Sequence, residues 1–213
     1  MKIDTDKIKA ESEATVLKAG GKICEWLPYI EFTKIRDEEQ VVARALILNA
    51  MINIHFQAPT EVVADWISRH NLNSFLSERE KSILSRENEG LTEQEGVDLY
   101  WYIEALWAFL WATNIVDKMD FATAIPDSMA SMCPDLQIDE GDERFTENMS
   151  LRDYDDLYKE RDLYYRVMWY ARQLSLTSGA DPKFDMSRTM ERRKALEWIM
   201  DAELDWDDVP LDT

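Results

Sequence analysis

The 213-residue sequence has few of the residues that interrupt or cross-link secondary structure: 2 cysteines, 6 glycines and 6 prolines. Cys24 and Cys133 lie far apart, and neither has a CxxC neighbour. This argues against a disulfide scaffold or a zinc ribbon and fits a reducing compartment. The scarcity of glycine and proline leaves few turn signals, which favours long helices over a β-sandwich or a β-barrel.

The sequence contains no recognisable targeting or membrane-spanning element. Residues 1–22 have no apolar core of the signal-peptide type, and no apolar run is long enough to cross a membrane. Together with the two isolated cysteines, these absences predict a cytoplasmic protein with no membrane partner.

The motifs of several large enzyme classes are also absent. The sequence has no GxSxG, P-loop or GxGxxG motif, so serine hydrolase, NTPase and dinucleotide-binding functions have no support. His55 and His70 have no histidine or cysteine partner at metal-ligand spacing, and the acidic residues 201–208 lack the DxDxDG turn of a calcium loop. We therefore predict neither a metal site nor a cofactor.

Basic residues are scarce: 24 Lys and Arg stand against 43 Asp and Glu, which gives a net charge of -19. One interpretation is a device for solubility, and the other is an acidic surface for a basic protein partner. Bacterial immunity proteins that neutralise cationic toxins such as nucleases offer an analogy at the level of the fold. With no catalytic motif in the sequence, we expect a protein-interaction module with such a surface.

The same charge argues against nucleic acid as a partner. DNA and RNA repel a strongly anionic protein at long range. Mimicry of DNA needs regularly spaced carboxylates on an elongated surface, whereas the acidic residues at 139–147 and 201–208 are clustered. We therefore predict no nucleic-acid partner.

Apolar residues are abundant, at 46% of the chain, and include 8 Trp, 8 Tyr and 7 Phe. This is enough for the packed interior of one domain spanning residues 1–213. Helical spacing of apolar residues predicts an all-α fold. The predicted helices cover about residues 4–19, 37–56, 61–70, 77–87, 92–113, 150–176 and 187–202.

Three predicted regions lie outside this helical body. Residues 1–22 form an N-terminal helical extension that ends at Gly20-Gly21, and residues 203–213 form an acidic tail anchored by Trp206. Residues 117–149 contain Pro126, Pro134 and an acidic run at 139–143, which predicts an irregular acidic loop with one helical turn near residues 128–132.

Two capping boxes are the local signals of helix starts with the clearest physical mechanism. Ser77-x-x-Glu80 and Thr92-x-x-Glu95 each place a hydroxyl on the N3 amide and a carboxylate on the N-cap amide of a helix. Ser150-x-x-Asp153 predicts a similar start for the helix that ends near Leu176.

One helix has an unusual composition, because residues 101–111 (WYIEALWAFLW) carry a single charge, Glu104. A helix that is apolar on every side is normally buried, so this segment predicts a buried central helix. A buried carboxylate needs a cationic or hydrogen-bond partner. Candidate partners are the arginines of residues 161–166 and 191–194.

The simplest assembly brings Glu104 and Glu191 together with Arg161 or Arg166. Helical spacing puts Arg161 on an otherwise apolar face and Glu191 at the head of an apolar stripe. Arg166 lies four residues after Asp162, the spacing of a surface ion pair worth a few tenths of a kcal/mol. The candidate cluster is Glu104, Arg161, Arg166, Glu191 and Arg192, and the candidate pocket aromatics are Trp101, Tyr165, Trp169 and Trp198.

This cluster has two interpretations that the residues leave open. It can be a buried ion-pair network that fixes the register of the helices. Alternatively, it can be the site of an enzyme or small-molecule binder, in which carboxylates and an arginine hold a ligand between aromatic walls.

Six segments give the sequence a resemblance to a known family. They are LKAGGKICEWLP (17–28), VVARALILNAMINIHFQAPTEVVADWI (41–67), IEALWAFLWA (103–112), DLYYRVMW (162–169), ERRKALEW (191–198) and DWDDVPLDT (205–213). In combination they resemble the bacterial family called domain of unknown function 4272, over nearly the whole chain.

The resemblance carries over motif positions but no established activity. It places these residues in the motifs: Glu104, Arg166, Trp169, Glu191, Arg192, Trp198 and Trp206. It also implies a departure, since relatives commonly show histidine where this chain has Met168 and Lys194. Proton transfer through those histidines is therefore not expected in this protein.

Overall fold

The computed structural model of the protein describes residues 3–177 and 179–212. Within these ranges the chain forms α-helices and short 3-10 helices but no β-strand, so the predicted all-α fold is confirmed. The α-helices are α1 (Thr5–Lys18), α2 (Glu38–His55), α3 (Thr60–Arg69), α4 (Glu78–Leu84), α5 (Glu93–Ala112), α6 (Glu143–Thr146), α7 (Tyr154–Leu176) and α8 (Met186–Met200). The 3-10 helices are Asn73–Phe75, Asn88–Gly90, Asp127–Met132, Leu136–Ile138 and Pro182–Phe184.

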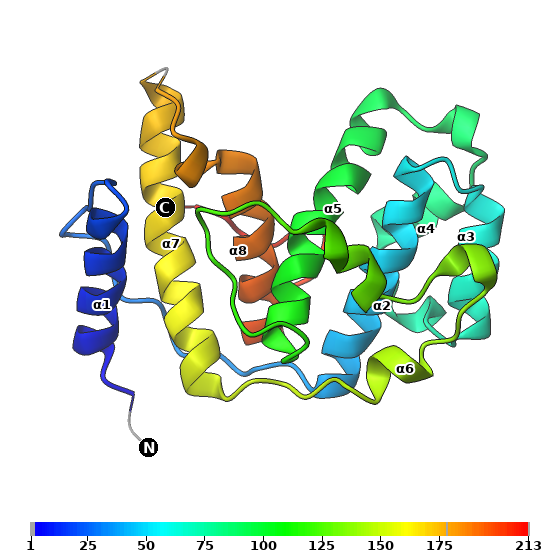
Figure 1. Cartoon of the computed structure of the whole chain (residues 1–213), viewed down its shortest axis with the longest axis horizontal. Helices are drawn as coiled ribbons and strands as arrows, with labels where there is room; N and C mark the ends of the chain where they lie inside the picture. Colours follow the sequence, from blue (N-terminus) through cyan, green and yellow to red (C-terminus); the bar gives the residue numbers. More distant parts are fainter. Residues whose placement is uncertain (1–2, 178, 213) are drawn as a thin grey trace.

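The long helices lie side by side in a row, in the order α1, α7, α8, α5, α2 and α3, with α4 next to α3 (Figure 1). This order mixes the two halves of the chain, because α1 packs against α7 and α5 lies between α8 and α2. Neither half can bury its helices without the other, and the result is a single domain. None of the described helices combines the length and the hydropathy needed to cross a membrane.

Helix α5 occupies the middle of the row, as its composition predicts. Its residues from Glu104 to Ala112 are all buried, on every side of the helix. Phe109 contacts Trp198 of α8 and Trp206 of the tail, with ring centroids 5.9 Å and 6.0 Å away. A helix that is apolar all round needs neighbours on both sides, and α2 and α8 provide them.

Both predicted capping boxes are present, at Ser77 before α4 and at Thr92 before α5. The predicted start of α7 at Ser150 is wrong, because Asp153 is the residue at the N-cap position and its side chain makes no capping hydrogen bond. The backbone N–H groups of Ser150 and Arg152 instead donate to the carbonyls of Thr113 and Ala112, at 3.0 Å and 2.9 Å. They satisfy carbonyls at the C-terminal end of α5, which the helix itself leaves without partners.

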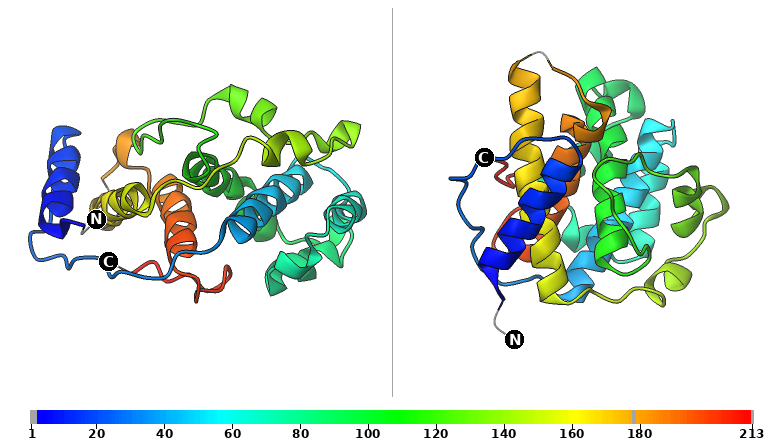
Figure 2. Two further views of the ribbon diagram at one scale, coloured as in Figure 1. Left: turned by 90° about the horizontal axis from the view of Figure 1, so that it is seen from below. Right: turned by 60° about the vertical axis from the view of Figure 1, so that its left-hand side comes forward.

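Two sets of connecting segments cover opposite sides of the helix row (Figure 2, left). Residues 117–149 run over one side, here called the loop face, and contain no helix longer than the six residues of Asp127–Met132. Residues 19–37 and the tail from residue 201 run over the other side, here called the tail face. These two segments are joined to each other by a hydrogen bond from Ala202 N–H to Lys34 O, at 2.8 Å.

The ends of the tail-face segments are fixed by a glycine pair and a tryptophan. Gly20 has a φ of +92°, which favours glycine and ends α1, and a side chain on Gly21 would lie 2.7 Å from the ring of Phe184. Trp206 of the tail is 2% exposed and meets Trp198 edge to face, with ring centroids 5.9 Å apart. A single aromatic side chain thus holds an otherwise acidic tail against the core.

Candidate functional site

Glu104 pairs with Arg192, and not with Arg161 or Arg166 as the simplest assembly predicts. Both nitrogens of one edge of the guanidinium reach Oε2 of Glu104, with Nε at 2.8 Å and Nη2 at 2.7 Å. Nε of Arg188 lies 4.0 Å from the other oxygen. Burial raises the pKa of Glu104, and the charge of Arg192 opposes this rise. Glu104 is therefore a buried carboxylate whose charge is stabilised mainly by Arg192, with a smaller contribution from Arg188.

Arg192 also joins the start of the loop-face segment to the core. It is fully buried, and it donates to the carbonyl oxygens of Asp120 at 2.8 Å and Thr123 at 3.1 Å. Its Nη1 lies 3.3 Å from the hydroxyl of Tyr164. With these donors satisfied, Arg192 is rigid, and it holds both Glu104 and the entry into the loop.

The other predicted arginines belong to separate ion pairs. Nε of Arg161 lies 2.7 Å from Oε2 of Glu197, and Nε of Arg193 lies 3.1 Å from Oε1 of the same glutamate. Arg166 binds Asp162 through two hydrogen bonds, at 2.9 Å and 2.7 Å. The prediction of a surface pair at Asp162 and Arg166 is wrong, since both side chains are at most 3% exposed. They are covered because α1 packs on α7 at this point.

Glu191 makes no ion pair in the described part of the chain, and its Oε2 is buried without a hydrogen-bond partner. Burial raises its pKa to about 7. Glu160, which the sequence did not single out, is similar: its Oε1 has no partner, and burial raises its pKa to about 8. In the sequence Glu160 lies one helical turn before Tyr164, but the contact of Tyr164 with Arg192 is known only from the structure.

On the loop face, a cavity of about 840 Å³ lies between α2, α5 and residues 124–144. Glu104 is the member of the predicted cluster that lines it. Apolar side chains from the three segments form much of the wall, among them Ile52, Ile103, Leu106, Ile125 and Met129. Asn49 stands on α2 and donates to the carbonyl of Pro134 at 3.0 Å, which holds the loop over the cavity.

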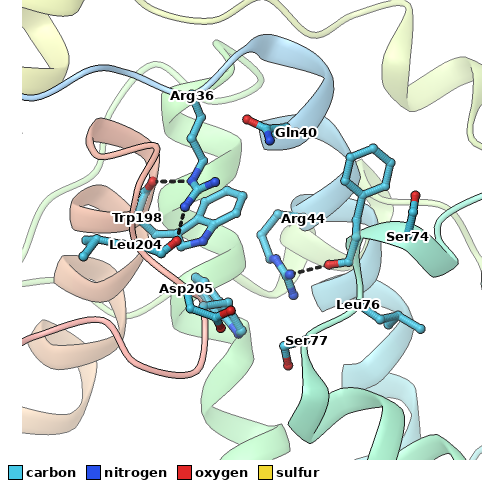
Figure 3. Close-up of a pocket in the computed structure, with 11 residues that line it drawn as sticks. Arg36, Gln40, Arg44, Ser74, Leu76, Ser77, Trp198, Leu204 and Asp205 are labelled. Carbon is cyan, nitrogen blue, oxygen red and sulfur yellow. Dashed lines mark hydrogen bonds between the residues drawn. The ribbon is translucent and has the colours of Figure 1, made fainter.

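On the tail face, a smaller pocket of about 210 Å³ lies between residues 36–44, residues 74–77 and the tail (Figure 3). Arg36, Arg44 and Trp198 line it, together with Gln40, Ser74, Phe75, Leu76, Ser77, Leu204, Asp205 and Trp206. We call it the arginine pocket. Neither of its arginines was singled out from the sequence. Arg36 lies in the segment before α2 and Arg44 lies on α2, and their spacing gives no sign that they line one pocket.

The predicted pocket aromatics do not line a common pocket. Trp198 faces the arginine pocket, whereas Tyr165 packs with Cys24 and Leu27 of the segment that follows α1, and Trp169 lies against that group. Trp101 is half-buried and meets Tyr100 edge to face, with ring centroids 5.5 Å apart. The four aromatics therefore belong to three different regions of the molecule.

At the two positions where the resemblance implies a departure, the side chains have structural contacts. Sδ of Met168 accepts a hydrogen bond from Arg193 at 3.2 Å. Nζ of Lys194 lies 4.3 Å from the ring centroid of Trp206. Among the described residues, no group of three or more His, Cys, Asp or Glu side chains is arranged to hold a metal ion.

Fold and site together define an all-α domain whose core helix carries a buried ion pair beside a cavity. The profile of the family described as domain of unknown function (DUF4272) matches residues 9–209, so the chain belongs to this family. No curated protein and no solved structure matches the chain.

Proposed function

We propose that the protein binds a small polar molecule in the cavity on the loop face, with Glu104 as the anchor. The observation that carries this proposal is the position of a buried, arginine-paired carboxylate on the wall of an 840 Å³ cavity. Cavities of this size that combine apolar walls with a few polar groups are typical ligand sites.

The charges of the lining favour a neutral or cationic ligand that donates hydrogen bonds. Glu104, Asp127, Asp135 and Glu140 line the cavity, whereas Arg144 is the cation among its lining residues. Arg144 is itself bound to Glu140, with Nε 2.7 Å from Oε1. An amine or amidine group would complement Glu104, because Arg192 contacts Oε2, whereas Oε1 has only the longer contact with Nε of Arg188 at 4.0 Å.

The experiment uses benzylamine and benzamidine as probes, with benzoate as the probe of opposite charge. Titration calorimetry on the wild type is expected to detect binding of the two cations and not of benzoate. Glu104→Gln should abolish this binding. Glu197→Gln is the matched control, because it also removes the carboxylate of a buried arginine pair but does not line the cavity.

Equal loss of binding in both variants would assign the effect to general destabilisation. Unchanged binding in Glu104→Gln, or tighter binding of benzoate than of benzylamine, would contradict the proposal. The first outcome would assign the ion pair of Glu104 and Arg192 a purely architectural role, and the second would mean that the cavity prefers an anion.

A second candidate function is the interaction module for a basic protein partner, and the distribution of charge supports it. The most buried charged residues of the described chain are six arginines and four carboxylates, namely Arg36, Arg44, Arg161, Arg166, Arg192 and Arg193 with Glu80, Glu104, Asp162 and Glu197. This set has two excess positive charges, so the rest of the chain carries a formal charge of -21 instead of the overall -19. Such an exterior attracts basic proteins at long range.

Small basic nucleases are the test partners for this second function. A specific complex should form with one-to-one stoichiometry and weaken as salt is raised. Two sets of acidic residues are then neutralised by substitution: Asp139, Asp142 and Glu143 on the loop face, and Asp205, Asp207 and Asp208 on the tail. One set should weaken the affinity for the nuclease more than the other. Equal weakening by both sets, with no fixed stoichiometry, would indicate unspecific attraction.

A further inference from the structure

Arg36 differs from every other buried arginine of the described chain. The other five each have a carboxylate oxygen within 3.1 Å: Arg44 at Glu80, Arg161 and Arg193 at Glu197, Arg166 at Asp162 and Arg192 at Glu104. Arg36 is 7% exposed, but no carboxylate of the described residues lies within 4.0 Å of it. A buried cation without an ion-pair partner is costly unless a group of opposite charge occupies the space beside it.

The contacts of Arg36 fix its guanidinium at the wall of the arginine pocket. Nε donates to the carbonyl of Trp198 at 2.8 Å, and Nη2 donates to the carbonyl of Leu204 (Figure 3). The guanidinium lies over the indole of Trp198, with Cζ of Arg36 3.8 Å from the ring centroid. These partners orient the guanidinium but supply no full negative charge, so its charge remains uncompensated at short range.

Arg44 brings a second guanidinium to the same pocket. Its Nη1 lies 2.7 Å from both oxygens of Glu80, and its Nη2 donates to the carbonyl of Phe75 at 2.5 Å. The side chain of Arg44 is 4% exposed, and its Nε is buried without a hydrogen-bond partner. Burial lowers the pKa of Arg36 and the charge of Arg44 lowers it further, whereas the carboxylates of Asp201, Asp205 and Asp37 oppose this lowering. Two arginines and one carboxylate, Asp205, line the pocket, and Arg36 is the arginine without an ion pair.

We propose that the arginine pocket binds a small oxyanion, either a phosphate or sulfate ion or the carboxylate of a small molecule, between Arg36 and Arg44. The volume of about 210 Å³ suits a group of this size. Guanidinium groups bind oxyanions through paired hydrogen bonds, and the indoles of Trp198 and Trp206 in the wall reduce competition from water. Gln40 and Ser74 offer further polar groups at the lining.

Asp205 also lines the pocket and sets a limit on the affinity. Its Oδ1 accepts the backbone N–H of Asp207 at 2.9 Å, which keeps the carboxylate in place. A negative charge at this position repels an incoming anion. The site is separate from the cavity of Glu104, since no residue lines both. The tail that contributes to the arginine pocket and the loop that contributes to the cavity run over opposite sides of the helix row (Figure 2, left).

The test is titration calorimetry with sodium phosphate, sodium sulfate and sodium acetate at constant ionic strength, with sodium chloride as the reference. We expect one site with a Kd of about 1 mM or lower for an oxyanion. Tighter binding of phosphate and sulfate identifies a tetrahedral anion, and tighter binding of acetate identifies a carboxylate. Absence of binding for all three oxyanions, or equal binding of chloride, would overturn the proposal.

Two variants and one control locate the site. Arg36→Gln should weaken binding at least about tenfold, whereas Arg69→Gln, which removes an exposed arginine paired with Asp139, should leave it unchanged. Asp205→Asn should strengthen binding about threefold, because a like charge is removed. This second variant removes no hydrogen bond of Arg36, so it remains informative if Arg36→Gln fails to fold. Binding that is unaltered by Asp205→Asn, or lost equally in Arg69→Gln, would contradict the assignment.

Discussion

The loop face and the tail face each have a hollow beside a buried arginine, but the arginines are used in opposite ways. On the loop face, Arg192 lies behind Glu104, so the cavity meets a carboxylate. On the tail face, Arg36 forms the wall itself and has no carboxylate within 4.0 Å in the described chain. The two hollows should therefore prefer ligands of opposite charge, although the protein as a whole is strongly acidic. Net charge predicts long-range attraction, whereas the charges nearest a pocket determine what it binds.

Arg192→Met is expected to have the largest effect, a loss of about 3–5 kcal/mol in the free energy of unfolding. The substitution leaves Glu104 buried without its cation and frees the carbonyls of Asp120 and Thr123. Urea denaturation followed by far-UV circular dichroism measures this loss. A decrease below about 1 kcal/mol would show that the loop face is not held by this arginine.

Trp206→Ala is expected to separate the two faces. It removes a fully packed aromatic side chain from contact with Trp198 and Phe109, which should lower stability by about 3 kcal/mol. Because the tail supplies part of the arginine pocket, oxyanion binding should be lost while benzylamine binding on the loop face persists. Calorimetry with both probes on the variant checks this. Loss of binding for both probes would mean that the two faces are not independent.

Glu160→Gln should change the dependence of stability on pH. An unfolded glutamate ionises near pH 4.5, whereas burial raises the pKa of Glu160 to about 8 in the folded protein. The folded state thus keeps a proton that the unfolded state loses, so this group lowers the stability of the wild type as pH rises from about 4.5 to 8. The variant lacks this contribution.

Relative to the wild type, Glu160→Gln should gain almost nothing at pH 4.5 and then about 1.4 kcal/mol of stability for each unit by which the pH rises from there toward 8. Urea denaturation at several pH values between these limits measures the difference. Parallel curves for the two proteins would contradict the raised pKa. Glu191, with a pKa of about 7, causes a further decrease in stability over a narrower pH range, and it is present in both proteins.

Thr92→Ala gives the smallest effect and serves as the reference that touches neither hollow. It removes the hydroxyl that accepts the backbone N–H of Glu95 at the start of α5. The expected loss is about 1 kcal/mol in the free energy of unfolding, with benzylamine and phosphate affinities unchanged. A change in either affinity would show that binding follows overall stability.

The fold was predictable where local signals are strong. The ends of the helices were predicted to within a few residues from three signals: both capping boxes, the glycine pair after α1 and the apolar periodicity. Ser150 was misread because its sequence pattern is that of a cap, while the tertiary structure uses its backbone N–H to satisfy the end of α5. A cap pattern cannot reveal which carbonyls elsewhere in the chain need a partner.

The site was predictable in its residue types but not in its pairing. Glu104 is indeed buried with an arginine, but helical spacing shows only which residues share a face and not which helices become neighbours. The order of the row places α8 between α5 and α7, so Arg192 of α8 reaches Glu104 first. Arg36 carried no local signal, since its distinguishing feature is the absence of a nearby carboxylate in three dimensions.

Two-dimensional NMR of the tryptophan indole N–H groups and asparagine side-chain amides, with phosphate and benzylamine added in turn, tests the central claim most directly. Phosphate should shift the indole signals of Trp198 and Trp206, which line the arginine pocket. Benzylamine should instead shift the amides of Asn49 and Asn53, which line the cavity of Glu104. If both probes shift the same signals, or if phosphate leaves Trp198 and Trp206 unchanged, the assignment of opposite charge preferences to the two faces is wrong.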